Sequence, residues 1–238
     1  MPSATAEGWA VPTPVTGGLP VAVSRFRAMD DPFLTAFHGL AIAEGADRPE
    51  LERPMALLAD ALGRVVPAPE RPRTTLPVVD EHLAATLAAG VGPVADLARM
   101  IAPRTSWAAP YPDYAGEPDM DAMRLGYAYS SIIGATEDAA SGRAVTPVYL
   151  SDEVFAGMVL QGPGITYPSH AHKAVEVYWA ITGSADWQKG DEWSTHGPGS
   201  VILHETGVRH ATITGSEPQL MFFAWVTDPA CVPVIIRL

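Results

Sequence analysis

The hydrophobic pattern changes its period near residue 126, and this change constrains the fold more than any other feature of the chain. Downstream of it, short apolar runs such as "VFAGMVLQG", "VEVYWAIT", "SVILHE" and "LMFFAWV" are separated by Gly, Pro, Asp and Ser. Side chains that alternate with a period of two lie on opposite faces of a β-strand. Many short strands joined by turns predict a mainly β domain, either a sandwich or a barrel.

Upstream of this change, the apolar residues follow a helical period. Residues 30–63 carry apolar side chains at intervals of three and four, and a second helical segment begins near Asp80. Gly90 and the Gly92-Pro93 pair divide that second segment into two shorter helices, because proline does not continue a helix. We therefore expect helices in front of the β domain.

These patterns divide the chain into three parts. Residues 1–20 are rich in Pro, Gly, Ser and Thr and predict an irregular arm. Residues 21–122 form a helical extension that ends in a long aromatic and proline-rich loop at 103–122, and residues 123–238 form the barrel.

Composition excludes several classes of partner. The 238 residues carry a formal net charge of −12 and 47% hydrophobic side chains, so the chain can bury a large core but does not suit nucleic acid or an anionic membrane. No apolar run approaches the length of a transmembrane helix, and the N-terminus lacks the pattern of a signal peptide. With Cys231 as its single cysteine, the chain forms no internal disulfide, and we expect a cytoplasmic protein.

Histidines gather in the β region. Five of the seven lie there: His170, His172, His196, His204 and His210. His170 and His172 are two residues apart, so on a strand they point to one face with Cα atoms about 6–7 Å apart. Two imidazoles placed in this way can converge on one metal ion.

Glu176 and Tyr178 follow at an even number of residues from His170 and His172, so on a strand they would point to the same face. A straight strand would put Glu176 about 20 Å from His170, which is too far for both to bind one ion. We therefore expect the chain to bend near Lys173-Ala174, so that two strands face one interior. The alternation predicts Glu176, Tyr178 and Ala180 inside and the apolar Val177, Trp179 and Ile181 outside, under the helices. Another ligand must come from a distant strand, where "GSVILHETGVRH" offers His204 and His210.

The spacing of these residues resembles the two sequence motifs of the cupin superfamily. The first motif is matched at every position by Gly164, His170, His172, Glu176 and Gly183. The second is matched by Gly199, Gly207 and His210, with Glu205 in place of its proline and Thr214 in place of its asparagine. The resemblance implies a cupin double-stranded β-helix with an α-helical N-terminal extension.

The cupin resemblance also implies a metal site. It assigns His170, His172, Glu176 and His210 as ligands of one divalent transition metal. Three imidazoles and one carboxylate suit Zn, Fe, Mn, Ni or Co, and the sequence does not choose among them. His196 is left as a turn residue, and His204 is expected to point inward or to support the ligands.

A narrower resemblance is to the cupin-type dimethylsulfoniopropionate (DMSP) lyases of marine bacteria. It is carried by Tyr178 two residues after the motif glutamate, Tyr167 three before the first histidine, the segment "GYAYSSIIG" at 126–134, and the helical extension. It implies β-elimination of a small zwitterionic substrate, DMSP, to dimethyl sulfide and acrylate. Tyr178 is our first choice for the base because a nearby cation lowers the pKa of a phenol, and Tyr167 is the second.

The sulfonium group of such a substrate carries a fixed positive charge, which aromatic faces bind. The candidates for this contact are Trp107, Tyr111, Tyr114, Tyr127 and Tyr129, with Trp187 as a further one. Two alternatives stay open. One is another metal-dependent cupin enzyme, a dioxygenase or an isomerase, and the other is a non-catalytic cupin that binds a small molecule. A homodimer is also left open.

Overall fold

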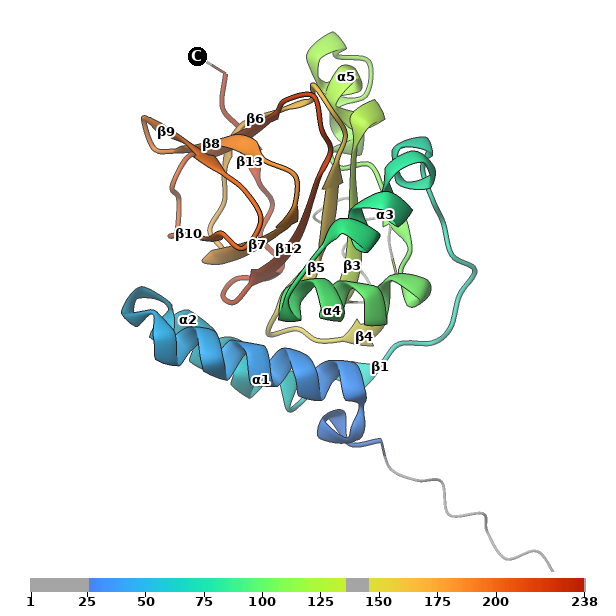
Figure 1. Ribbon diagram of the computed structural model, residues 1–238, viewed down its shortest axis with the longest axis vertical. Helices are drawn as coiled ribbons and strands as arrows, with labels where there is room; N and C mark the ends of the chain where they lie inside the picture. Colours follow the sequence, from blue (N-terminus) through green and yellow to red (C-terminus); the bar gives the residue numbers. More distant parts are fainter. Residues whose placement is uncertain (1–25, 136–145, 238) are drawn as a thin grey trace, which may run out of the picture.

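The computed structural model describes residues 26–135 and 146–237, so the arm expected at 1–20 lies outside the described residues. Within them helices dominate up to residue 126 and strands follow from residue 127, as the change of period predicts (Figure 1). The helical part also contains two strands of two residues each. The α-helices are α1 (Pro32–Asp47), α2 (Glu52–Leu62), α3 (Pro77–Ala89), α4 (Pro93–Ile101) and α5 (Pro118–Gly126). Short 3-10 helices are η1 (Ala28–Asp30), η2 (Pro49–Leu51), η3 (Ala102–Arg104) and η4 (Pro112–Tyr114).

Proline marks the start of most of these helices. It is the first residue of α1, α3, α4 and α5, where its fixed φ suits a helix and its missing N–H is not needed. Asp31 also caps α1, since its Oδ1 accepts the backbone N–H groups of Phe33 at 2.9 Å and Leu34 at 3.2 Å. The predicted division between α3 and α4 is confirmed, and Gly92 between them has a positive φ of 84°, which favours glycine.

The strands form two sheets that face each other. They are β1 (Val66–Pro67), β2 (Trp107–Ala108), β3 (Tyr127–Gly134), β4 (Tyr149–Leu150), β5 (Phe155–Gln161), β6 (Thr166–Ala171), β7 (Glu176–Thr182), β8 (Ala185–Lys189), β9 (Glu192–His196), β10 (Val201–His204), β11 (His210–Thr214), β12 (Gln219–Trp225) and β13 (Val234–Ile235). The larger sheet has the order β1-β4-β3-β5-β12-β7-β10, with β2 beside β3, and the smaller has the order β13-β6-β11-β8-β9. From β5 onward the chain crosses repeatedly between the sheets, as in a double-stranded β-helix.

The larger sheet has one face toward the helices and the other toward the barrel interior (Figure 1). Strand β7 shows the alternation that the sequence predicts. Trp179 points to the helices, where its ring meets the edge of Phe37 on α1 at 6.3 Å between centroids. Tyr178, one residue earlier, points into the interior and packs against Trp187 and Phe223. The core is therefore two apolar layers, one on each side of this sheet.

Tyr149 of β4 ties α1 to the larger sheet. Its hydroxyl donates to Oδ2 of Asp31 at 2.8 Å and accepts a hydrogen bond from Nη1 of Arg104 at 2.6 Å. Its ring stacks on Phe33 with centroids 6.0 Å apart. The residue that caps α1 is therefore also held by the sheet.

The segment 103–122 differs from the single long loop that the sequence predicts. It contains β2, which pairs with β3, and η4, and it ends within α5, so the expected boundary after residue 122 falls inside a helix. Helix α5 buries only Met120 and Met123, and its apolar pattern is too short to indicate a helix. Pro118 at its first position and the acidic first turn were the available signals.

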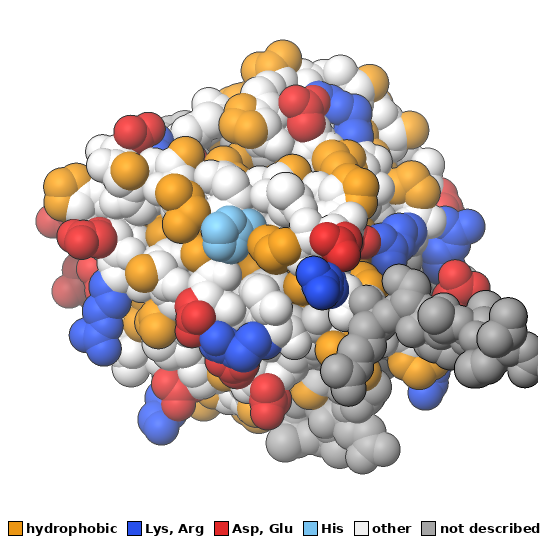
Figure 2. All heavy atoms as spheres, turned by 90° about the horizontal axis from the view of Figure 1, so that it is seen from below, with side chains coloured by type: hydrophobic (Ala, Val, Ile, Leu, Met, Phe, Trp, Pro, Cys, Tyr) orange, Lys and Arg blue, Asp and Glu red, His pale blue; other side chains and the backbone are white. Residues whose placement is uncertain are grey.

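Charges of both signs are mixed on the face that Figure 2 shows, where Lys and Arg side chains lie scattered among Asp and Glu. No continuous basic patch is visible there, in keeping with the net charge of −12. No helix in the described part of the chain has both the length and the apolar content needed to cross a membrane.

Candidate metal centre

Three of the predicted ligands lie where the chain passes from the smaller sheet to the larger one. His170 is in β6 and His172 follows directly after it, while Glu176 is the first residue of β7. The bend expected near Lys173-Ala174 is present between these strands. It places Glu176 against His172, with Oε2 of the carboxylate 3.0 Å from Nε2 of the imidazole.

Strand pairing brings the distant histidine to the same place. His210 begins β11, which pairs with β6 so that His210 lies directly opposite His170. The two ring centroids are 4.0 Å apart, and that of His172 lies 4.9 Å from His210. Ligand atoms of the three histidines all lie within 4.8 Å of one another, which is close enough to surround one ion.

Backbone carbonyl groups orient all three imidazoles in the same way. Nδ1 of His170 donates to the carbonyl of Pro168 at 2.9 Å, and that of His210 donates to the carbonyl of Val208 at 2.9 Å. Nδ1 of His172 makes the same bond to Ala174 at 3.0 Å. When the Nδ1–H of a neutral imidazole donates to a carbonyl, Nε2 carries the lone pair and can bind a metal. Histidine ligands of metals are usually held in this way.

Glu176 completes the group as a buried carboxylate. Oε2 lies 3.4 Å from Nε2 of His210 as well as close to His172, and Oε1 accepts the indole N–H of Trp225 at 2.6 Å. Burial alone would raise the pKa of Glu176, but the charge and hydrogen bonds of the neighbouring imidazoles bring that pKa well below its ordinary value. The carboxylate is therefore ionised.

The donor set fits a divalent cation. Burial, followed by the proximity of His210, lowers the pKa of His170 well below its ordinary value, so this imidazole is neutral. Nε2 of His210 is buried and has no hydrogen-bond partner among the described residues. A nitrogen lone pair that faces an ionised carboxylate repels it unless a proton or a metal ion lies between the two. Three nitrogens and one carboxylate oxygen suit a transition metal.

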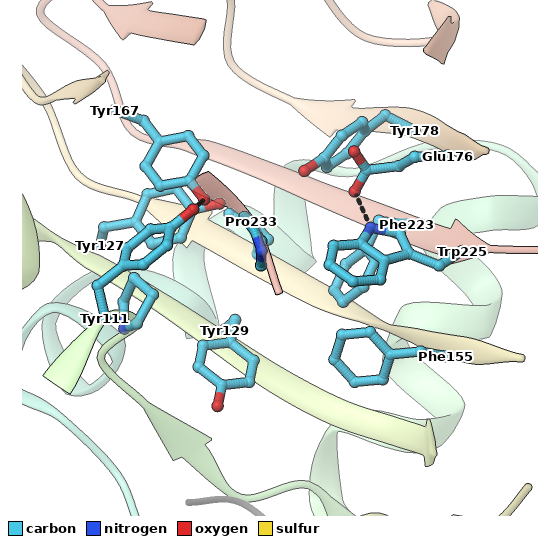
Figure 3. Close-up of a pocket in the computed structure, with 12 residues that line it drawn as sticks. Tyr111, Tyr127, Tyr129, Phe155, Tyr167, Glu176, Tyr178, Phe223, Trp225 and Pro233 are labelled. Carbon is cyan, nitrogen blue, oxygen red and sulfur yellow. Dashed lines mark hydrogen bonds between the residues drawn. The ribbon is translucent and has the colours of Figure 1, made fainter. Parts of the chain in front are cut away.

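An aromatic cavity adjoins this group (Figure 3). Its empty volume, open mouth included, is about 570 Å³, and Glu176 and Tyr178 form part of its wall. The remaining lining is mainly aromatic: Tyr111, Tyr127, Tyr129, Phe155, Tyr167, Phe223 and Trp225, with Pro110, Val159 and Pro233. The cavity therefore has an apolar lining with an ionised carboxylate at one place on its wall.

The structure brings three of the five residues predicted to bind substrate into this cavity, namely Tyr111, Tyr127 and Tyr129. Tyr114 lies behind Tyr111, with the two ring centroids 5.9 Å apart. Trp107 does not line the cavity, because β2 turns its ring into the apolar layer on the helix side of the sheet. Trp187 is buried against the ring of Tyr178 and also lies outside the lining.

The two candidate bases have different surroundings. The hydroxyl of Tyr167 is hydrogen-bonded to that of Tyr111 at 2.6 Å, and its ring stacks on Tyr127 at 4.5 Å. Tyr178 shares the cavity wall with Glu176 and carries no such tyrosine stack (Figure 3). Burial raises the pKa of both phenols well above the ordinary value, and the charge of Glu176 adds to this effect at Tyr178.

Sequence reasoning missed the residues that β5 and β12 contribute. Phe155, Phe223 and Trp225 line the cavity, and Trp225 also holds Glu176. The sequence signal for Phe223 and Trp225 was their spacing of two residues in "LMFFAWV", which puts both on one face of a strand. His196 ends β9, and His204 is fully buried beside His210.

The crossing strands and the interior group of three imidazoles and one carboxylate define a cupin with a candidate transition-metal site. Solved structures agree on the fold. The crystal structure of the DMSP lyase DddQ from Ruegeria pomeroyi DSS-3 matches with a TM-score of 0.62 at 23% identity, over 86% of this chain and 96% of that one. A structure described as that of the DMSP lyases RdDddP and RnDddQII matches with a TM-score of 0.62 at 21% identity, over 86% and 98%.

Sequence comparisons give the family. The family model described as dimethylsulfoniopropionate lyase matches residues 51–221. A Cereibacter sphaeroides protein assigned as the DMSP lyase DddL is 31% identical over 77% of this chain and 75% of its own length. DddQ of Ruegeria pomeroyi is 33% identical over 88 residues, 37% of this chain and 44% of the relative. The chain therefore belongs to the dimethylsulfoniopropionate lyase family, a family of carbon–sulfur lyases.

Proposed function

We propose that this protein is a metal-dependent lyase that cleaves DMSP to dimethyl sulfide and acrylate by β-elimination. The observation that carries the proposal is that Glu176 and Tyr178 share the wall of an aromatic cavity beside three converging imidazoles. The names of the relatives support DMSP as the substrate.

The metal would be held by His170, His172, Glu176 and His210, whose ligand atoms face one another in the barrel interior. Zn, Fe, Mn, Ni and Co all suit this set. Such an ion supplies positive charge that stabilises the charge developing near the substrate carboxylate and favours the phenolate form of a neighbouring tyrosine. The backbone carbonyls that hold the three imidazoles keep their lone pairs directed inward before substrate arrives.

The aromatic lining suits the other end of the substrate. A sulfonium group has a fixed positive charge and no N–H or O–H donor, so it is bound best by the faces of aromatic rings, at about 0.5–2 kcal/mol for each ring. Tyr111, Tyr127, Tyr129 and the aromatic residues of β5 and β12 provide such faces.

The elimination needs one base. The phenolate of Tyr178 takes a proton from the carbon next to the substrate carboxylate, and the electron pair of that C–H bond forms the new carbon–carbon double bond. The bond between the next carbon and sulfur breaks, its electron pair leaves with sulfur, and the products are neutral dimethyl sulfide, acrylate and a protonated Tyr178. Tyr167 is the second choice, because its hydroxyl is hydrogen-bonded to that of Tyr111 and it lies on β6, whereas Tyr178 shares β7 with Glu176.

One assay tests this proposal. The protein is loaded with each candidate metal and incubated with DMSP, and dimethyl sulfide is measured in the headspace, with His210→Ala and Tyr178→Phe in parallel. We expect product from the wild type and almost none from either variant, although Tyr178→Phe should retain its metal. No product from the wild type with any of the metals would refute the lyase proposal. Full activity of Tyr178→Phe would refute only the choice of base.

A further inference from the structure

His204 is a buried histidine that the proposed reaction does not use. It is the last residue of β10, has no exposed surface, and neither ring nitrogen has a hydrogen-bond partner among the described residues. Its ring stacks on that of His210, with centroids 4.1 Å apart and an angle of 24° between the planes. Buried polar groups are nearly always hydrogen-bonded, so two unpartnered nitrogens on one ring need an explanation.

The bonding of Nδ1 separates His204 from the three proposed ligands. His170, His172 and His210 each commit Nδ1 to a backbone carbonyl, so each can present only Nε2 to the centre. Nδ1 of His204 has no such bond and lies 3.8 Å from Oε2 of Glu176. His204 is therefore able to direct an N–H group toward the carboxylate without losing another hydrogen bond.

Glu176 has room for this donor. Its other oxygen, Oε1, already accepts the indole N–H of Trp225 at 2.6 Å. Oε2 lies 3.0 Å from Nε2 of His172 and 3.4 Å from Nε2 of His210. Both nitrogens are proposed to bind the metal, and a nitrogen that binds a metal carries no proton, so neither donates to Oε2 in the metal-loaded protein. Closing the gap from 3.8 Å to a hydrogen bond needs a movement of less than about 1 Å.

The ring planes argue against His204 as a further metal ligand. Donor atoms of Glu176, His204 and His210 do lie within 4.8 Å of one another. However, the lone pair of an imidazole lies in the plane of its ring, and the planes of His204 and His210 are stacked and only 24° apart. Lone pairs in two such planes do not converge on one ion, so a hydrogen bond to the carboxylate is the better use of His204.

We propose that His204 is a positioning residue that donates its Nδ1–H to Oε2 of Glu176. Trp225 on one carboxylate oxygen and His204 on the other then fix the orientation in which Glu176 meets the metal. The proposal rests on the metal centre of the proposed function but not on the substrate, so metal binding tests it separately from lyase activity.

A matched set of variants distinguishes the two nitrogens. His204→Asn puts an amide N–H close to the place of Nδ1, His204→Gln puts one close to the place of Nε2, and His204→Phe keeps an aromatic ring without a donor. Affinity for Zn²⁺ or Co²⁺ is measured by competition with a chromophoric chelator. We expect His204→Asn to stay near the wild type and His204→Gln and His204→Phe to bind about 10–100-fold more weakly. His196→Asn, at the end of β9, serves as the control and should be unchanged.

Wild-type affinity in His204→Phe would overturn the proposal, and so would a loss in His204→Asn as large as that in His204→Phe. The nitrogen shifts of the His204 ring in the metal-loaded wild type, read by long-range ¹⁵N–¹H NMR, decide the question even if a variant does not fold. The Nδ1–H tautomer is expected, and the Nε2–H tautomer or a metal-bound nitrogen would overturn the proposal. Metal binding by His210→Ala at wild-type affinity would instead refute the ligand set of the proposed function.

Discussion

Trp225 and Glu176 lie directly opposite each other on the paired strands β12 and β7, and the indole N–H donates to the carboxylate at 2.6 Å. The same indole packs against the ring of His172, with centroids 4.4 Å apart. One side chain of the larger sheet therefore contacts two of the proposed metal ligands, one through a hydrogen bond and the other through its ring face.

We predict that Trp225→Phe weakens metal binding by about 10–100-fold, because it keeps an aromatic ring but leaves Oε1 of Glu176 without its donor. Chelator competition gives the affinity. Trp187→Phe is the matched control, since it removes a buried indole N–H that has no hydrogen-bond partner in the described part of the chain. Equal losses in the two variants would show that the effect is general packing.

Tyr178→Phe should lower kcat by about 10²–10⁴-fold while metal content stays at the wild-type level, because only the proposed base is removed. Tyr167→Phe should lose much less activity. A phenol loses its proton as pH rises, so the phenolate that is proposed to act as the base becomes more abundant. The wild-type kcat should therefore increase with pH, as a kcat–pH profile would show. A large loss in Tyr167→Phe, with Tyr178→Phe active, would reverse the assignment.

The two glycines of the first motif should differ in their tolerance of a methyl group. Both have positive φ, 69° at Gly164 and 71° at Gly183. A Cβ at Gly164 would meet nothing within 4 Å, whereas one at Gly183 would lie 2.1 Å from the carbonyl oxygen of Pro218. We expect Gly164→Ala to cost about 1–2 kcal/mol of unfolding free energy and Gly183→Ala about 3–5 kcal/mol, measured by urea unfolding. Equal costs would mean that the loop of Pro218 moves aside.

Tyr149→Phe should destabilise the protein by about 1–3 kcal/mol, because it removes the hydroxyl that joins Asp31 and Arg104. Burial, with a contribution from Asp31, raises the pKa of Tyr149 from 10.0 to about 12. The folded state therefore holds this proton more tightly than the unfolded state. The stability from Tyr149 is complete below pH 10 and is lost as pH rises through about 12. Urea unfolding at pH 8 and pH 11 should show a smaller difference between the two proteins at the higher pH.

The sequence contains enough information to predict the centre of the barrel but not the surroundings of the cavity. Spacing and parity placed His170, His172 and Glu176 around one bend, because strands have a fixed period and the two histidines and the glutamate are close in the chain. The choice between His204 and His210 could not be made from spacing alone. It depends on the pairing of β11 with β6, which places His210 opposite His170.

The sequence is less informative about which aromatic residues line the cavity, because an aromatic ring suits a cavity wall as well as a hydrophobic core. Trp107 and Tyr129 lie on paired strands, but their rings point to opposite faces of the sheet. The face toward which β2 points its ring depends on its register with β3, and a strand of two residues has too little alternation to reveal that register. The short helix α5 escaped prediction for a similar reason.

The pairing of β11 with β6 also has a consequence for how the protein matures. His170, His172 and Glu176 are close in the chain and meet once β6 and β7 have formed. His210 joins them only when β11 pairs with β6, after β8, β9 and β10 have formed. Contacts between residues distant in the chain form slowly during folding. The proposed metal site of a nascent chain would thus lack one ligand until the last third of the barrel has folded, and tight metal binding would mark the completion of folding.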